Sequence, residues 1–193
     1  DIDIRTRWRW TGFEGELLVF DTPEGRQLLQ PVITILALGG ASWPRLGSDA
    51  AWMPWLAARG VSITPFRPAN MGFRVNWTPH MERFYGQPVK GIALTAAGQT
   101  ARAEFVISER GLEGGAIYAL SAAMRDGAAL ALDLVPDIAP HQLEDRLAKA
   151  RPADSVANQL RKSIGLDQIK IALLQEFSHP LPKDSASLGR IVK

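Results

Sequence analysis

A change of pattern near Pro136 constrains the fold of this chain most strongly. Before Pro136, short β-branched and apolar runs are separated by prolines and glycines; after it, apolar residues recur at helical spacing. Short, evenly spaced strands favour a small antiparallel barrel or sandwich, whereas the second pattern predicts amphipathic helices. The sequence therefore predicts an α+β chain in which a small antiparallel β-barrel precedes a small helical subdomain.

The first sixty residues predict a β-meander, a further strand and a short helix. Residues 32–38 form a continuous β-branched run, which is typical of a strand covered on both faces. Residues 50–59 predict a helix that ends at Gly60. The three strands of the meander are expected at 2–11, 17–20 and 27–30.

The remaining elements follow from the same patterns. Strands are expected at 63–66, 72–76, 89–95, 101–107 and 129–135, with a helix at 114–124. Helices are expected at 140–149, 154–162 with Asp154 as N-cap, and 167–177. The tail, with Pro180 and Pro182, predicts an extended exit. The expected parts are therefore residues 1–60, a barrel at 61–136, helices at 137–178 and an exit linker at 179–193.

Composition excludes several classes of protein. Hydrophobic residues make up 46% and charged residues 22%, as in ordinary globular proteins, so disorder and coiled coil are disfavoured. There is no Cys, which excludes disulfides and a cysteine nucleophile. The three histidines are far apart, so no metal site is expected. A net charge of +2 is weak support for nucleic-acid binding.

The start of the chain carries no secretory signal, and its longest apolar run is too short to cross a bilayer. We therefore expect a cytoplasmic protein without a membrane partner. Because there is no initiator Met, we expect the chain to be processed or to be part of a longer protein.

One stretch, residues 36–49, suggests a ligand site. Its apolar run ends in Gly39 and Gly40, where the backbone can approach a ligand closely at the carboxyl end of a strand. From the residues alone, a plain corner between strand and loop is the favoured explanation, because paired glycines after a strand are common in turns. The usual phosphate loops, the G-x-G-x-x-G fingerprint and the G-x-S-x-G elbow are absent from the sequence, and no catalytic acid or base can be identified.

The stretch Leu38-Gly39-Gly40-Ala41-Ser42-Trp43-Pro44-Arg45-Leu46-Gly47-Ser48-Asp49-Ala50 resembles the central signature of the YhiN/BaiN-like family of FAD-dependent oxidoreductases. Leu38 stands where that family has Thr, and Ala50 where it has Gly. Three further segments agree with the family in order and spacing: 67–73, 105–118 and 132–137. The resemblance implies the end of an FAD domain, an inserted barrel and a helical subdomain.

The resemblance also implies a site. The cofactor-binding candidates are Gly39, Gly40, Ser42, Pro44, Gly47 and Ser48. Weaker candidates for substrate contact are Arg45, Asp49, Asn70 and Gly111. For each of these residues a structural role is an equal alternative. The implied activity is hydride transfer by FAD, with NAD(P)H as electron donor, to an activated carbon–carbon double bond in a small molecule or an RNA base.

Family members are longer, and begin with a dinucleotide-binding βαβ unit that this sequence lacks. The resemblance therefore implies a central fragment that needs the N- and C-terminal parts of its parent chain and is inactive alone. Two other readings remain open. The helical part is a nucleic-acid-binding module, or the insert is a spacer or a homodimer surface. Arg151, Arg161, Lys162 and Lys170 favour nucleic acid, whereas interspersed Asp145, Asp154, Asp167 and Glu176 oppose it.

Overall fold

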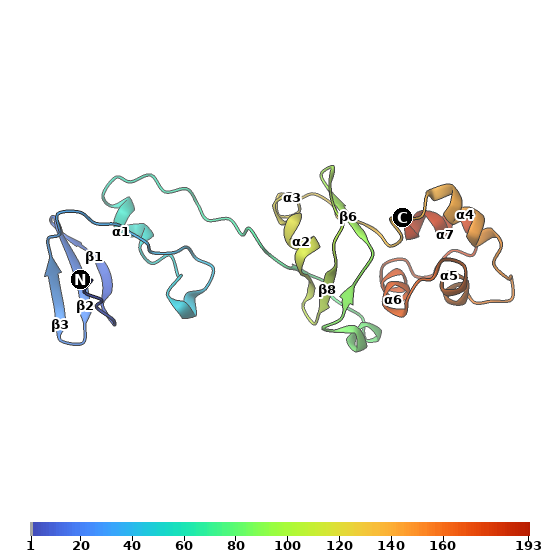
Figure 1. Ribbon diagram of the computed structural model, residues 1–193, viewed down its shortest axis with the longest axis horizontal. Coiled ribbons are helices and arrows are strands. Elements are labelled where there is room, and N and C mark those ends of the chain that lie inside the picture. Colours follow the sequence, from blue (N-terminus) through green and yellow to red (C-terminus); the bar gives the residue numbers. More distant parts are fainter. Residues whose placement is uncertain (1) are drawn as a thin grey trace. The chain divides into compact units, whose positions relative to one another are not determined.

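The computed structural model describes residues 2–193, so Asp1, the first residue of the expected 1–60 segment, lies outside the described residues. The chain divides into two compact units, residues 1–67 and 68–193, here called the N-terminal and C-terminal units (Figure 1). The first boundary follows Arg67 and not residue 60, because Phe66 still packs within the N-terminal unit. Its ring lies edge-on to Trp52, with the centroids 6.0 Å apart.

The N-terminal unit contains the predicted meander. Strands β1 (Arg9–Glu14), β2 (Leu17–Thr22) and β3 (Gly25–Leu29) pair antiparallel in the order β1-β2-β3. A bulge between Trp10 and Gly12 interrupts the β1–β2 register. Helix α1 (Met53–Ala57) is shorter than the expected 50–59.

Two strand predictions in this unit are wrong. Residues 2–8 and 32–38 form no strand. Val32, Ile33 and Ile35 are 101%, 80% and 88% exposed. A strand exists only through the hydrogen bonds of its neighbours, and among residues 2–193 no segment pairs with 32–38. The apolar pattern alone therefore does not make a strand here.

The C-terminal unit begins with two antiparallel sheets, in the orders β10-β6-β7 and β4-β9-β8-β5. The α+β class and its antiparallel barrel are thereby confirmed, although no strand forms at 63–66. The bounds are β4 (Phe73–Arg74), β5 (Pro88–Val89), β6 (Ala93–Ala96), β7 (Gln99–Ala101), β8 (Phe105–Ser108), β9 (Gly111–Glu113) and β10 (Ala131–Asp133).

The strands expected at 89–95 and 101–107 each divide into two. Gly91 has φ +59°, so the chain turns between β5 and β6 and the two strands join different sheets. Similarly, β7 stays with β6 while β8 pairs with β5 and β9. Each predicted run thus passes from one sheet of the barrel to the other.

Helices fill the rest of the C-terminal unit. Within the barrel part lie the 3₁₀ segment η2 (Pro79–Phe84) and the short helices α2 (Gly115–Ala119) and α3 (Ser121–Arg125). Helices α2 and α3 replace the single helix expected at 114–124. Then follow α4 (Pro140–Ala148), α5 (Val156–Ile164), α6 (Gln168–Phe177) and α7 (Ser185–Val192). Ser155, not Asp154, caps α5: its side chain accepts from the Asn158 N–H.

The exit linker expected at 179–193 is wrong for most of its length, because α7 occupies residues 185–192. The two prolines precede this helix and do not interrupt it. Asp184 caps it by accepting the Ser187 N–H at 2.8 Å, and this backbone hydrogen bond lowers the pKa of the Asp184 carboxyl. Leu188 and Val192 are buried, so the tail completes the core.

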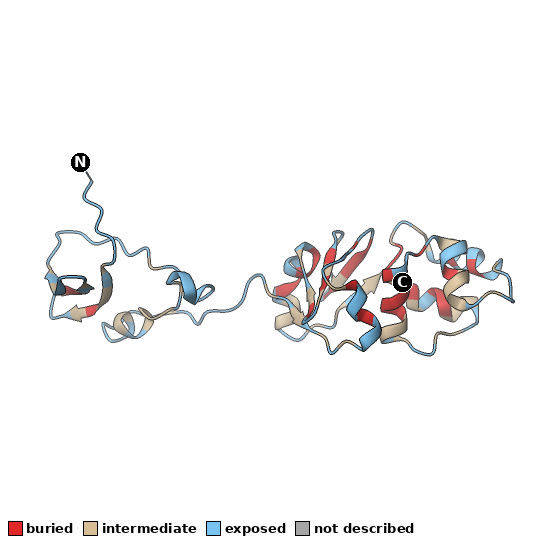
Figure 2. Cartoon of the chain, turned by 90° about the horizontal axis from the view of Figure 1, so that it is seen from below, coloured by how far each residue is buried: buried red, intermediate tan, exposed pale blue. Residues whose placement is uncertain are grey.

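One apolar core extends through the barrel and the helices of the C-terminal unit (Figure 2). The barrel contributes Leu94, Phe105 and Ile107, all at most 1% exposed. The helices contribute Leu160 and Leu173, at 0% and 2%. The expected barrel and helical parts therefore share one core, and burial of this apolar area stabilises both together.

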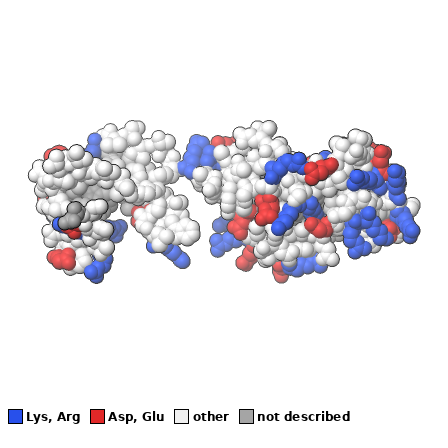
Figure 3. All heavy atoms as spheres, viewed as in Figure 1, with Lys and Arg blue, Asp and Glu red and all other residues white. Residues whose placement is uncertain are grey.

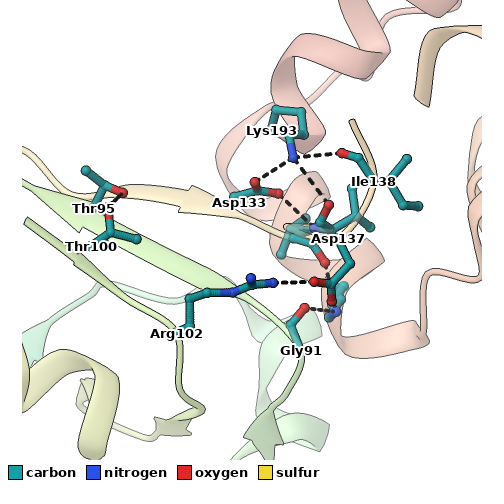
Figure 4. Close-up of polar contacts among 11 residues, drawn as sticks. Gly91, Thr95, Thr100, Arg102, Asp133, Asp137, Ile138 and Lys193 are labelled. Atoms are coloured by element: carbon teal, nitrogen blue, oxygen red, sulfur yellow. Dashed lines mark hydrogen bonds and ion pairs between the residues drawn. The ribbon is translucent and has the colours of Figure 1, made fainter. Parts of the chain in front are cut away.

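Polar contacts fasten the junction after β10 (Figure 4). The Lys193 ammonium donates to the Ile138 carbonyl at 3.0 Å and pairs with Asp133 at 2.7 Å. The Lys170 ammonium donates to the Gly91 and Leu134 carbonyls at 3.1 and 2.8 Å, and burial lowers the pKa of Lys170. Helix α6 thereby holds carbonyls of the barrel edge, and the end of the chain holds the segment that follows β10.

The close packing of the sheet β4-β9-β8-β5 can be tested at Gly111, where the neighbouring backbone leaves no room for a side chain. A Cβ at this position would lie 2.0 Å from the Phe73 carbonyl oxygen and 2.7 Å from the Val75 nitrogen, and φ is +142°. We expect Gly111→Ala to lower the free energy of unfolding by about 3 kcal/mol or more, measured by urea denaturation. In Gly115→Ala the new methyl meets no atom within 4 Å, and the change should be neutral or slightly stabilising. Equal stabilities of the two variants would contradict this packing.

Candidate functional site

A closed loop in the N-terminal unit brings together most of the residues expected at a site. Its two ends meet at Gly40. The Gly40 carbonyl accepts from the Ala50 N–H at 3.0 Å, and the Gly40 N–H donates to the Ser48 hydroxyl oxygen at 3.1 Å. Gly39 has φ +68°, a conformation that favours glycine. The backbone groups of Gly40 therefore close the loop. Gly39 and Gly40 are called the glycine corner below.

An inner turn lies within this loop. Trp43 and Ser48 exchange two backbone hydrogen bonds, both of 3.2 Å. Between them, Pro44–Leu46 form a 3₁₀ turn that ends at Gly47 with φ +86°. Arg45 and Leu46 are exposed on this turn. The turn thus presents a cationic and an apolar side chain to solvent from a fixed backbone.

Two aromatic side chains support the glycine corner. The Trp52 indole N–H donates to the Gly39 carbonyl at 3.1 Å. A Cβ at Gly40 would lie 3.5 Å from the Phe66 ring, which itself packs on Trp52. Trp52 and Phe66 were not among the candidates, and the sequence signal that could have found Trp52 is its place just after the motif.

The loop explains the positions of eight of the ten candidates. Ser48 is the acceptor that closes it, and the Asp49 carboxylate accepts the Ala51 N–H at 3.0 Å. Ser42 is exposed and its hydroxyl has no hydrogen-bond partner among the described residues. The remaining candidates on the loop are Gly39, Gly40, Pro44, Arg45 and Gly47.

The other two candidates, Asn70 and Gly111, lie in the C-terminal unit. Gly111 pairs with Arg74 across β4 and β9, and the close contacts of its backbone explain the glycine structurally. Asn70 is exposed in the segment before β4. Beside it, Met71 is held through both its N–H and its carbonyl by the buried Ser121 hydroxyl, at 3.2 Å each. Sequence reasoning missed Ser121.

The loop fits one side of a cofactor site. The N–H groups of Ala41 and Ser42 have no partner among residues 2–193, so they can donate to a ligand beside the close-approaching glycine backbone. The Gly40 N–H, by contrast, is already bonded to Ser48. With so few free donors and no helix following the corner directly, these residues suit contact with a flavin but not the whole binding of a pyrophosphate.

The C-terminal unit holds an apolar cavity of about 460 Å³ between barrel and α6. Ser178 is its polar lining residue; the others are apolar, among them Phe73, Phe105, Leu132, Leu173 and Phe177. With no charged group it offers no acid or base. Among the described residues no group of His, Asp and Glu could hold a metal ion.

His80 serves to join η2 to α6. Thr78 donates to Glu176 through its backbone N–H and its hydroxyl, at 2.9 and 2.7 Å. The Nδ1 atom of His80 lies 2.6 Å from the Thr78 hydroxyl, and its Nε2 atom lies 3.3 Å from the Ala172 carbonyl. The Glu176 side chain is only 4% exposed. This cluster therefore positions η2 against α6.

Comparison with known proteins assigns the family. The model of the HI0933-like protein barrel and H2TH domain matches residues 67–188, which are more than half of the chain. The chain belongs to the HI0933-like family. This family is one of FAD-dependent oxidoreductases, which agrees with the resemblance carried by residues 38–50. The matched segment corresponds to the barrel and helices of the C-terminal unit.

One curated relative is the ribosomal RNA dihydrouridine synthase of Escherichia coli (strain K12), 25% identical over 129 residues. The match covers 65% of this chain and 32% of the relative, so the HI0933-like chain spans about a third of that protein's length. No helix within residues 2–193 has both the length and the apolar composition that crossing a membrane requires.

The closure of the loop by Ser48 can be tested directly. Ser48→Ala removes the acceptor of the Gly40 N–H and should cost about 1 kcal/mol locally, so this amide should exchange with solvent about fivefold faster. Ser42→Ala, which removes an unbonded hydroxyl from the same loop, serves as the control and should leave the exchange unchanged. If Ser48→Ala behaved like the control, the loop would not depend on this bond.

Proposed function

We propose that this HI0933-like chain is the central part of an FAD-dependent oxidoreductase that reduces an activated carbon–carbon double bond in a base of RNA. The electron donor is NAD(P)H. The observation that carries the proposal is the joint presence of the family's barrel and helices at 67–188 and of the closed glycine loop at 39–50. The activity belongs to the complete protein, of which this chain supplies one side of the cofactor site.

The loop supports the cofactor part of the proposal. FAD, when bound, supplies hydride transfer, and a proton must reach the other carbon of the double bond. Gly39 and Gly40 would allow the chain to approach the flavin, and the N–H groups of Ala41 and Ser42, which have no partner among residues 2–193, would be available to donate to it. Pro44, Gly47 and Ser48 hold the shape of the loop. Arg45 and Asp49 are exposed on it and are the proposed substrate contacts.

The choice of an RNA base rests on the relative. That protein is named for making dihydrouridine in ribosomal RNA, a product formed by adding hydrogen across a double bond of uracil. The same chemistry needs a surface that holds RNA while one base reaches the flavin. The C-terminal unit, which contains the family's H2TH domain, is the part available for this in the chain.

The test uses the complete protein with FAD, NAD(P)H and ribosomal RNA that lacks dihydrouridine. We expect the protein to be yellow, and nucleoside mass spectrometry should detect a hydrogenated base that depends on NAD(P)H. Gly40→Val should displace Phe66 and lower FAD binding and product formation at least tenfold. Gly115→Ala, in helix α2, is the control and should retain both.

Three results would contradict the proposal. A folded, yellow and fully active Gly40→Val protein would remove the loop from the flavin site. A complete protein that binds FAD and oxidises NAD(P)H but leaves the RNA unchanged would exclude RNA as substrate. Tight, stoichiometric FAD binding by the 193-residue chain alone would show that the pyrophosphate is held within it.

A further inference from the structure

A basic hollow lies where α4 connects to α5. It measures about 390 Å³ and is lined by Lys149, Arg151, Asp154, Gln159, Lys162 and Ser163, with Ala150. The side chains of Lys149 and Arg151 are exposed, and neither has an ion-pair or hydrogen-bond partner among the described residues. Two cationic groups thus face a concave surface with their charge uncompensated.

The third cation is held in place. The Lys162 ammonium donates to both oxygens of Asp154, at 2.9 and 3.0 Å. The Gln159 amide donates to the Arg151 and Asp154 carbonyls, at 3.2 and 3.1 Å, and so fixes the connection between the helices. Asp154 compensates one of the three cations, which leaves the hollow positive and its backbone ordered.

Four acidic residues counted against nucleic acid in the sequence. Asp154 lines the hollow, where it pairs with Lys162, and Asp145 lies on α4, whereas the other two are engaged elsewhere in the fold. Asp167 caps α6 by accepting the Lys170 N–H at 2.9 Å, and Glu176 is bound by Thr78. From residue 146 through residue 162, both included, there are five basic side chains and one acidic side chain. Figure 3 shows Lys and Arg gathered over α4 and α5, with few acidic side chains among them.

The lining selects one kind of partner. Lys and Arg without a counter-ion bind phosphate, and a row of such groups neutralises successive phosphates of a nucleic-acid backbone. No aromatic side chain lines the hollow, so it is not a platform for base stacking. Contact with the backbone holds an RNA without reading its sequence, which suits an element that positions a substrate.

We propose that the hollow formed by Lys149, Arg151 and Lys162 binds the phosphate backbone of RNA. The inference rests on the proposed function for the identity of the nucleic acid, and it adds which surface of this chain holds that substrate. Lys149 and Arg151 contact phosphates directly. Asp154 holds the Lys162 ammonium in the lining of the hollow.

The experiment measures binding of the 193-residue chain to a fluorescein-labelled RNA stem-loop by anisotropy at several salt concentrations, without FAD or NAD(P)H. The double variant Lys149→Gln/Arg151→Gln should bind about tenfold more weakly at low salt, and its slope of log K against log salt should be smaller by about 2. Both changes should be the same for stem-loops of different sequence.

The matched control is Lys90→Gln/Arg102→Gln, which removes the same charge from the barrel, where Lys90 pairs with Glu104 and Arg102 with Asp137. It should bind like the unmodified chain. Absence of RNA binding by the unmodified chain, or equal loss in the two double variants, would overturn the inference. Binding that is lost only at the hollow, in a protein that reduces no RNA base, would leave the inference standing and refute the proposed function alone.

Discussion

Helix α6 is central to the C-terminal unit, because half of its ten residues are buried in the shared core and its polar side chains bind the barrel edge and the segment before η2. Five of its residues are buried: Ile169, Ile171, Ala172, Leu173 and Leu174. A helix that is apolar on several sides must be enclosed by other elements to be stable in water. Its polar residues also reach outward, since Lys170 holds carbonyls of the barrel edge and Glu176 holds Thr78 before η2. The two parts that the sequence suggested as separate are thus joined through one helix.

This arrangement matters for function because it fixes the basic hollow relative to the barrel. The hollow lies on α4, α5 and their connection, and Leu143, Leu147 and Leu160 anchor those helices in the shared core. An RNA held at the hollow would therefore be held by a rigid unit. The glycine loop is built differently: hydrogen bonds from its own backbone, Ser48 and Trp52 order it within the N-terminal unit. Contacts within the chain therefore order both the hollow and the loop.

Local patterns in the sequence predicted the elements that depend on local interactions. The helices α4, α5 and α6 begin and end within two residues of the expected positions. The meander was also predicted, since turn residues are a local signal, although the alternating residues 2–8 before β1 form no strand. The strand prediction for residues 32–38 failed because a strand needs neighbouring strands, and the apolar character of a segment cannot show whether such neighbours exist. The prediction of an extended tail failed because it rested on the two prolines, whereas a capped helix follows them.

The candidate site was predicted in part for the same reason. The glycine corner is a sequence motif, so its residues were found together. The supporting Phe66 and the acidic partners Asp154 and Glu176 act through tertiary contacts, which one sequence does not reveal. Gly111 shows the reverse case. Its place in a family motif suggested substrate contact, whereas the structure gives a steric reason for the glycine.

The claim that one core joins barrel and helices is tested most directly by native-state hydrogen exchange of the 193-residue chain carrying Leu173→Ala. We expect the free energies of opening at the Leu174 amide in α6 and at the Ile107 amide in β8 to fall by the same amount, about 2–5 kcal/mol. A fall at Leu174 with the Ile107 amide unchanged would show that the helices open independently of the barrel, and would contradict a shared core.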